Sequence, residues 1–188
     1  MADVEHSTLT GNELHEPKGA STALSGQVYV ANGAGSGAWK AAGGSVYGST
    51  YFTLNTNATA IASSLTYVTL DPSTWVESAT NGVTFSTDRF IVPSNGVYEV
   101  SMNVSFLGGG GGAGNIYNFA FAVNDVAVVA SAKLRRQTSS GDIGSGSSSL
   151  ILPLTALDEV SIQIQNESGT NNPTISEASF SIVQLLET

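Results

Sequence analysis

His6 and His15 are the only histidines in the chain, and histidine is the side chain best suited to act as a general base near neutral pH. Neither has a cysteine or a second histidine at the spacing of a metal-ligand pair, so we expect no metal site. No histidine follows residue 15, which removes a Ser-His-Asp triad from the remainder of the chain.

Carboxylates are the next candidates for chemistry. Asp158 and Glu159 are adjacent, so in a strand they point to opposite faces and cannot form an acid–base pair. A glycan depolymerase would need a carboxylate pair that faces a cleft, and the sequence nominates none. We therefore predict that the protein is not an enzyme and uses no cofactor.

Two short motifs have the composition of binding loops. Gly108–Gly114 is glycine-rich, but it lacks the Lys-Ser/Thr and the helix of a phosphate loop, which favours a flexible hairpin tip. Lys133–Arg136 contains three of the four basic residues that follow residue 45. Two interpretations of it stay open. It either contacts an anion or glycan, or it is a strand end beside a polar loop or acidic residues of a neighbouring subunit.

The composition predicts an all-β protein. The chain has 188 residues, of which 41% are hydrophobic and only 11% are charged, with 21 glycines and no cysteine. The net charge of −9 argues against nucleic acid or an anionic membrane as a partner. No secretory signal or membrane-spanning apolar run is evident, so we expect a soluble protein made in a host cytoplasm, without membrane insertion.

Apolar residues alternate with polar ones along most of the chain after residue 45. The pattern is clearest at Val97–Phe106, Asn115–Asn124, Glu159–Asn166 and Ala178–Leu186. Turn sequences separate these segments, and no segment has a helical period, which predicts a β-sandwich of the jelly-roll type. Weaker strands are predicted at Ser49–Asn55, Ser64–Leu70, Gly82–Phe85, Phe90–Val92, Val126–Leu134 and Ser149–Leu152.

Some of these strands carry apolar residues on both faces. Ile116, Ala120 and Ala122 lie opposite the aromatic face of one strand, and Val183 and Leu185 do so in another. A sheet covered on both faces in a single-domain sandwich needs a second subunit, so we predict a homo-oligomer. The alternative is that the aromatic residues fill the core of one sandwich. The predicted interface residues are Tyr117, Phe119, Phe121 and Phe180.

Residues 1–45 differ in pattern from the rest of the chain. Met1–Asn12 is polar, Gly26–Ala31 has the only strand pattern, and Asn32–Trp39 is rich in turn residues. The sequence therefore divides at a flexible joint into an extended arm, residues 1–45, and a sandwich domain, residues 46–188.

The sandwich segment resembles the trimeric jelly rolls of the tumour-necrosis-factor and complement superfamily. The resemblance rests on "FIVPSNGVYEVSMNVSF", "LDEVSIQIQN" and "ASFSIVQLL", although Leu157-Asp158-Glu159 replaces the Gly-Asp turn of those proteins. Members of that superfamily pack three jelly rolls around a threefold axis. The resemblance therefore implies a homotrimer for residues 46–188.

The arm is similar to the N-terminal segment of small tailed-bacteriophage virion proteins, which decorate capsids or form head or tail fibres. The likeness covers "HEPKGASTALSGQVYVANGAGSGAWK". It implies that the arm docks on the major capsid protein or a tail adaptor, its strand adding to a sheet edge. The alternative is that Gln27–Trp39 pairs with its own sandwich. The expected docking residues are Leu14, His15, Pro17, Lys18, Val28, Tyr29, Val30 and Trp39.

Together these patterns predict a structural protein on the virion surface, a trimeric head decoration or head fibre anchored by its arm. The alternative is a tail fibre or receptor-binding tip that recognises a host surface glycan. For that alternative, the sequence offers the loops at Asp142–Ser149 and Asn166–Asn172 as binding sites.

Overall fold

The protein is described from a computed structural model that covers residues 23–25, 27–31, 37–41, 46–70, 74–109, 114–139 and 141–187. The predicted docking residues Leu14, His15, Pro17 and Lys18 lie outside these described residues. The chain divides into two compact units, residues 1–44 and 45–188.

The first unit contains a β-hairpin of strands β1 (Gln27–Ala31) and β2 (Gly37–Ala41). Tyr29 lies opposite Trp39, and their rings meet edge to face with centroids 5.5 Å apart. A Cβ atom at Gly37 would lie 2.8 Å from the Tyr29 ring, so glycine is needed beneath it. The strand expected at Gly26–Ala31 is confirmed over Gln27–Ala31, where it pairs with β2 in a two-stranded sheet. The turn-rich segment predicted up to Trp39 is a strand from residue 37.

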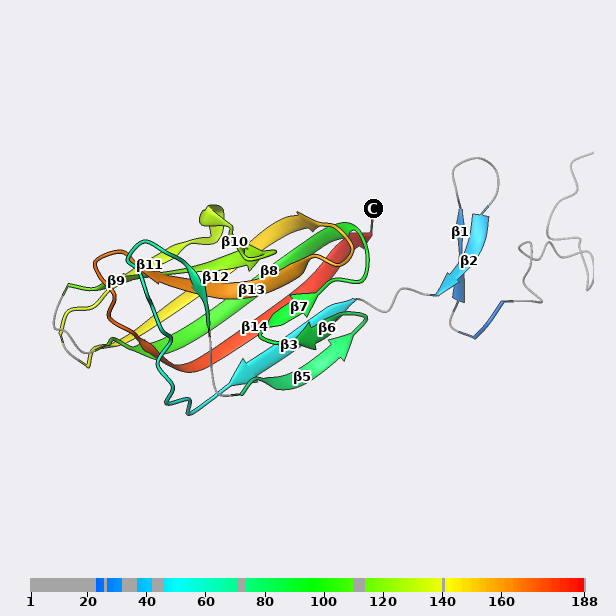
Figure 1. The fold of residues 1–188 in the computed structure, drawn as a ribbon. Coiled ribbons are helices and arrows are strands. Elements are labelled where there is room, and N and C mark those ends of the chain that lie inside the picture. The colour runs from blue at the N-terminus through cyan, green and yellow to red at the C-terminus, as the bar shows by residue number, and fades with distance from the viewer. Residues whose placement is uncertain are drawn as a thin grey trace, which may run out of the picture. The chain divides into compact units, whose positions relative to one another are not determined.

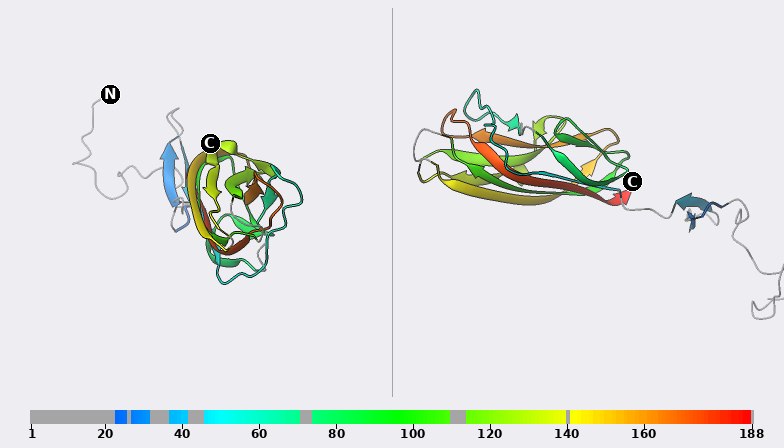
Figure 2. Two further views of the ribbon diagram at one scale, coloured as in Figure 1. Left: turned by 90° about the vertical axis from the view of Figure 1, so that its left-hand side faces the viewer. Right: turned by 90° about the horizontal axis from the view of Figure 1, so that it is seen from below.

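The second unit is a β-sandwich, which confirms the predicted fold class (Figures 1 and 2). One sheet has the strand order β12-β8-β14-β3-β5. Its strands are β3 (Tyr47–Phe52), β5 (Val76–Asn81), β8 (Gly96–Leu107), β12 (Ile143–Leu154) and β14 (Thr174–Glu187). All its neighbouring strands are antiparallel, and the central pairings β12–β8 and β8–β14 run nearly the full length of the strands.

The second sheet has the order β10-β9-β13-β7-β6, with β11 also pairing β9 and β4 also pairing β13. Its strands are β4 (Val68–Thr69), β6 (Thr84–Ser86), β7 (Arg89–Ile91), β9 (Ile116–Val123), β10 (Val126–Ala127), β11 (Lys133–Arg136) and β13 (Glu159–Asn166). The antiparallel sheets and their non-consecutive neighbours are compatible with a jelly roll.

The core lies between the two sheets and follows the period-two pattern. In β8 the residues Tyr98, Val100, Met102, Val104 and Phe106 are buried, while Glu99 and Asn103 are exposed. Phe90, Phe121 and Phe180 approach one another across the sheets, with ring centroids 4.7 Å and 6.2 Å from Phe180. The inward-facing apolar residues of one sheet therefore pack against those of the other sheet.

The predicted strand at Val126–Leu134 is wrong, because a short 3-10 turn (Val129–Ser131) separates β10 from β11. The cause is Ser131, whose hydroxyl accepts a 2.8 Å hydrogen bond from the Phe121 amide and donates one to the Val128 carbonyl. These bonds replace ladder hydrogen bonds at this point in the chain.

Candidate functional site on the five-stranded sheet

The outer face of the five-stranded sheet is lined with short polar side chains. Four strands place residues in one row across this face, so that Ser147 pairs with Asn103, Asn103 with Ser179, and Ser179 with Tyr51. The next row contains only serines and lies closer to the end of the sheet where β3 begins. It consists of Ser149, Ser101, Ser181 and Ser49.

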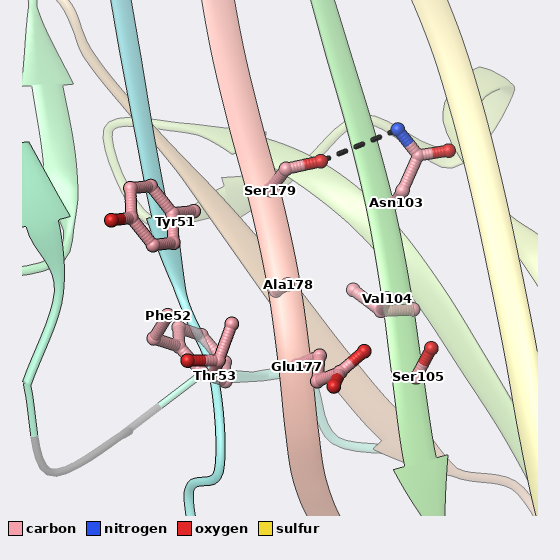
Figure 3. Close-up of a pocket in the computed structure, with 9 residues that line it drawn as sticks. All are labelled: Tyr51, Phe52, Thr53, Asn103, Val104, Ser105, Glu177, Ala178 and Ser179. Carbon is pink, nitrogen blue, oxygen red and sulfur yellow. Dashed lines mark hydrogen bonds between the residues drawn. The ribbon is translucent and has the colours of Figure 1, made fainter. Parts of the chain in front are cut away.

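A hollow of about 250 Å³ opens on this face (Figure 3). The side chains that face it come from three neighbouring strands, with the Tyr51 ring on one side of Ser179 and the Asn103 amide on the other. Asn103 donates a 3.4 Å hydrogen bond to the Ser179 hydroxyl. Glu177 and Ser105 border the hollow further along the same strands.

A second hollow, of about 360 Å³, shares Asn103 with the first. It is lined by Ser101, Ser147 and Ser149 and reaches Lys133 on the neighbouring strand β11. The two hollows adjoin at the Asn103 side chain and together span the outer face of β3, β14, β8 and β12. We call this feature the serine trough.

Apolar residues cluster on the same face, at the end of the sheet where β3 begins. Ile151, Val183 and Tyr47 occupy one cross-strand row with Glu99 between them, and Leu186 follows beside Val97. The side chains of Tyr47, Ile151, Leu185 and Leu186 are exposed. We call Tyr47, Ile151, Val183, Leu185 and Leu186 the apolar patch. Exposed clusters of this kind mark surfaces that bind a partner.

The predicted interface aromatics lie elsewhere. Tyr117, Phe119, Phe121 and Phe180 are at most 1% exposed within one chain, in the core between the sheets. A contact between subunits therefore has to use other side chains. Ala120 and Ala122 are also fully buried within one chain, so burying them does not require a second subunit. Leu185, on the other strand for which a cover was expected, is exposed.

In the predicted glycan loops, Asp142–Ser149 and Asn166–Asn172, several polar side chains form hydrogen bonds within the chain. The Asn115 Oδ1 atom accepts hydrogen bonds from the side-chain amides of Asn166 and Asn171, and the Asn115 amide donates to Gln137. Asp142 accepts two 2.9 Å bonds from the amide and hydroxyl of Thr138. These bonds, aided by Arg135, hold the pKa of the Asp142 carboxyl below its usual value. Further along β12, the side chains of Ser145, Ser147 and Ser149 point outward.

The described arm residues Val28, Tyr29, Val30 and Trp39 all lie in the hairpin. Tyr29 and Trp39 pack on one face, and Val28 and Val30 are exposed on the other. A two-stranded hairpin is only marginally stable by itself in water. Its apolar side chains therefore favour contact with a further surface.

The basic residues of the sandwich have unequal surroundings. Arg89 donates to Glu159 at 2.6 Å and lies 3.3 Å from Asp125, and the hydrogen bond to Glu159 raises its pKa. Arg135 pairs with Asp142. Among the described residues, Lys133 and Arg136 form no ion pair. Lys133 is thus a cation available at the end of the serine trough.

Within the part of the chain that the structure describes, no cluster of three or more His, Asp or Glu side chains could hold a metal ion. In the same part, no helix is long and apolar enough to cross a membrane. Comparison with known protein families finds no matching family model, and comparison with curated proteins finds no significant relative.

Sequence reasoning missed the serine trough. Each contributing strand shows outward serines separately, at 101–105, 145–149 and 179–181. The sequence signal for the trough is that all three segments carry serine, a small hydroxyl residue, at solvent-facing positions. Bringing them together requires the strand order, since β12, β8, β14 and β3 are far apart in the chain.

Proposed function

We propose that the protein is a non-enzymatic structural component of a tailed-phage virion, a homotrimer that decorates the outer capsid surface. Residues 1–45 anchor it to the major capsid protein, and the sandwich projects from the shell. The apolar patch is the observation that carries the assembly role, because exposed Ile, Leu and Tyr side chains in one cluster favour contact with another copy. The phage assignment rests on the resemblance of the arm.

The two-unit organisation supports the anchoring role. The sandwich buries its own core, whereas the hairpin leaves Val28 and Val30 exposed. Three hairpins from one trimer would bind a capsid cooperatively even if each contact were weak, because the second and third contacts form at high effective concentration.

The trimer is tested by light scattering after size-exclusion chromatography of the full chain. Wild-type protein is expected to be trimeric at micromolar concentration. Ile151→Asp places a charge in the apolar patch and is expected to weaken association at least tenfold. Ile143→Asp is the matched control, because Ile143 is also exposed on β12 but lies outside the patch.

Two results would contradict the assembly role: a monomeric wild-type protein, or equal loss of association in both variants. Thermal unfolding of each variant verifies that the sandwich is intact. The location is tested separately by gold labelling of virions with an antibody against residues 46–188. Gold around the head supports decoration, and gold at the tail tip rules out the capsid assignment.

A further inference from the structure

We propose that the serine trough is a binding site for an oligosaccharide. This inference does not depend on a virion location, because it concerns the chemistry of the sandwich surface alone. The trough crosses four strands, which at a strand spacing of about 4.8 Å gives a length of about 14 Å between the first and last strand. That length suits a short chain of sugars better than a single ring.

The walls of the trough offer both donors and acceptors, and the charged side chains that line it are Glu177 at the first hollow and Lys133 at the second. Serine hydroxyls can donate or accept, and the Asn103 side chain supplies both functions. Among the described residues, the hydroxyls of Ser105 and Ser147 have no hydrogen-bond partner. A sugar presents hydroxyl groups of the same dual character, so each can be paired without the desolvation of a buried charge.

Tyr51 supplies the apolar element that a sugar requires. One face of a pyranose ring carries C–H groups with a slight positive charge, and the face of an aromatic ring is slightly negative. The Tyr51 side chain is 41% exposed and lies beside the hollow (Figure 3). A sugar ring stacked on Tyr51 would place its hydroxyls beside Ser179, Asn103 and Glu177.

Other occupants fit the trough less well. The centre of a protein–protein interface is usually formed by large apolar or aromatic residues, and here those side chains lie in the apolar patch and not between Ser179 and Ser147. Nucleic acid is disfavoured by the net charge of −9 and by the single cation, Lys133, among the residues that line the trough. The serine, asparagine and tyrosine side chains that line the trough are complementary to a carbohydrate.

The binding experiment exposes the full-length protein to an array of neutral and acidic oligosaccharides, followed by titration calorimetry with the strongest binder. We expect at least one ligand with a dissociation constant of about 1 mM or tighter. Tyr51→Ala is expected to weaken binding at least tenfold, and Asn103→Ala at least threefold. Tyr51→Phe keeps the ring and should stay within twofold of wild type.

Val126→Ala is the control for nonspecific effects, because Val126 is exposed on the other sheet. Lys133→Gln identifies the kind of sugar: a loss of binding indicates an acidic oligosaccharide, and unchanged binding indicates a neutral one. The proposal is overturned if no oligosaccharide binds at millimolar concentration, or if Tyr51→Ala and Asn103→Ala bind like wild type.

A second measurement asks whether another copy of the chain covers the trough. The chain has no cysteine, so Ser147→Cys introduces a single reporter thiol. In the assembled protein, the thiol is expected to react with maleimide as fast as in an unfolded sample. Protection that is relieved by Ile151→Asp would show a subunit contact in the trough and would overturn the carbohydrate site while supporting the trimer.

Discussion

At the scale of single residues, Asp158 organises the turn before β13. Its carboxylate accepts hydrogen bonds from the Thr155 amide at 2.8 Å, the Thr155 hydroxyl at 3.0 Å and the Asn124 side chain at 2.8 Å. The neighbouring Leu157 has a φ of +73°, a left-handed conformation that an unsupported leucine rarely adopts. The carboxylate thus holds together two loops at the end where the chain enters the sandwich.

These bonds make stability depend on pH. Burial alone would raise the pKa of Asp158, but the hydrogen bonds from Thr155 and Asn124 outweigh it and lower the pKa below the usual value. A carboxyl with a lowered folded-state pKa contributes stability above about pH 4, and this contribution is lost as the pH falls through the folded pKa. Asp158→Asn should therefore lower the melting temperature at pH 7, and this penalty should shrink progressively as the pH falls below about 4.

Thermal unfolding monitored by circular dichroism at several pH values measures this difference. Glu177→Gln is the control, since Glu177 is exposed and, among the described residues, forms no ion pair. A penalty for Asp158→Asn that stays constant from pH 7 to pH 2.5 would contradict the role of the ionised carboxylate.

At this scale, the sequence predicts which aromatic residues share a buried face. It does not predict which part of the protein covers that face. The alternation along 115–124 predicts that Tyr117, Phe119 and Phe121 share one face. Whether that face meets a second sheet or a second subunit depends on contacts far away in sequence. In the structure Phe119 meets Phe106 of β8, with ring centroids 5.1 Å apart, so the chain's own sheet supplies the cover.

At the scale of elements, β12 shows how glycine fits a strand to a crowded core. Gly144 and Gly146 lie on its inner side. A Cβ atom at Gly144 would be 2.5 Å from Cζ of Phe106, whereas at Gly146 the nearest atoms are 3.5 Å away, an ordinary contact. The first glycine therefore makes room for an aromatic ring, and the second does not need to be glycine.

This contrast predicts unequal effects of the same substitution. Gly144→Ala is expected to destabilise the sandwich by about 1–3 kcal/mol, because the buried Phe106 ring has to move within a packed core. Gly146→Ala should change stability by less than about 0.5 kcal/mol. Urea unfolding of both variants gives the comparison, and equal effects would mean that the Phe106 contact does not limit position 144.

Strands with strong alternation could be predicted, and those with small residues could not. The apolar period predicts the segments at β8, β9, β13 and β14. For β12, the pattern predicts only Ser149–Leu152, because Gly144, Gly146 and the outward serines give no hydrophobic signal. β5, which is mostly exposed, escapes prediction for the same reason. The strand conformation of these segments comes from pairing with neighbours.

At the scale of the whole molecule, the described features are distributed unequally between the two units. The sandwich contains the core, the apolar patch and the serine trough, all within residues 46–188. The hairpin forms a sheet of its own and leaves Val28 and Val30 exposed. Assembly and carbohydrate binding should therefore be separable from anchoring by truncation, and separable from each other by substitution.

Deletion of residues 1–45 tests this division. Because no described residue of the first unit belongs to the core of the sandwich, the truncated protein should fold and remain trimeric. It should fail to bind purified virus particles from which the native protein has been removed, since residues 1–45 are the proposed anchor. Cosedimentation with such particles is the measurement, and full-length Ile143→Asp serves as a control with normal binding.

Full-length Ile151→Asp separates anchoring from avidity in the same assay. If one hairpin suffices, this variant binds as tightly as wild type. If three hairpins act together, the dissociated chain keeps its anchor but binds at least a hundredfold more weakly, because the gain from effective concentration is lost. We expect the second result, since a hairpin of two short strands offers little surface for a single strong contact. Particle binding by the truncated trimer would show that the anchor lies in the sandwich instead.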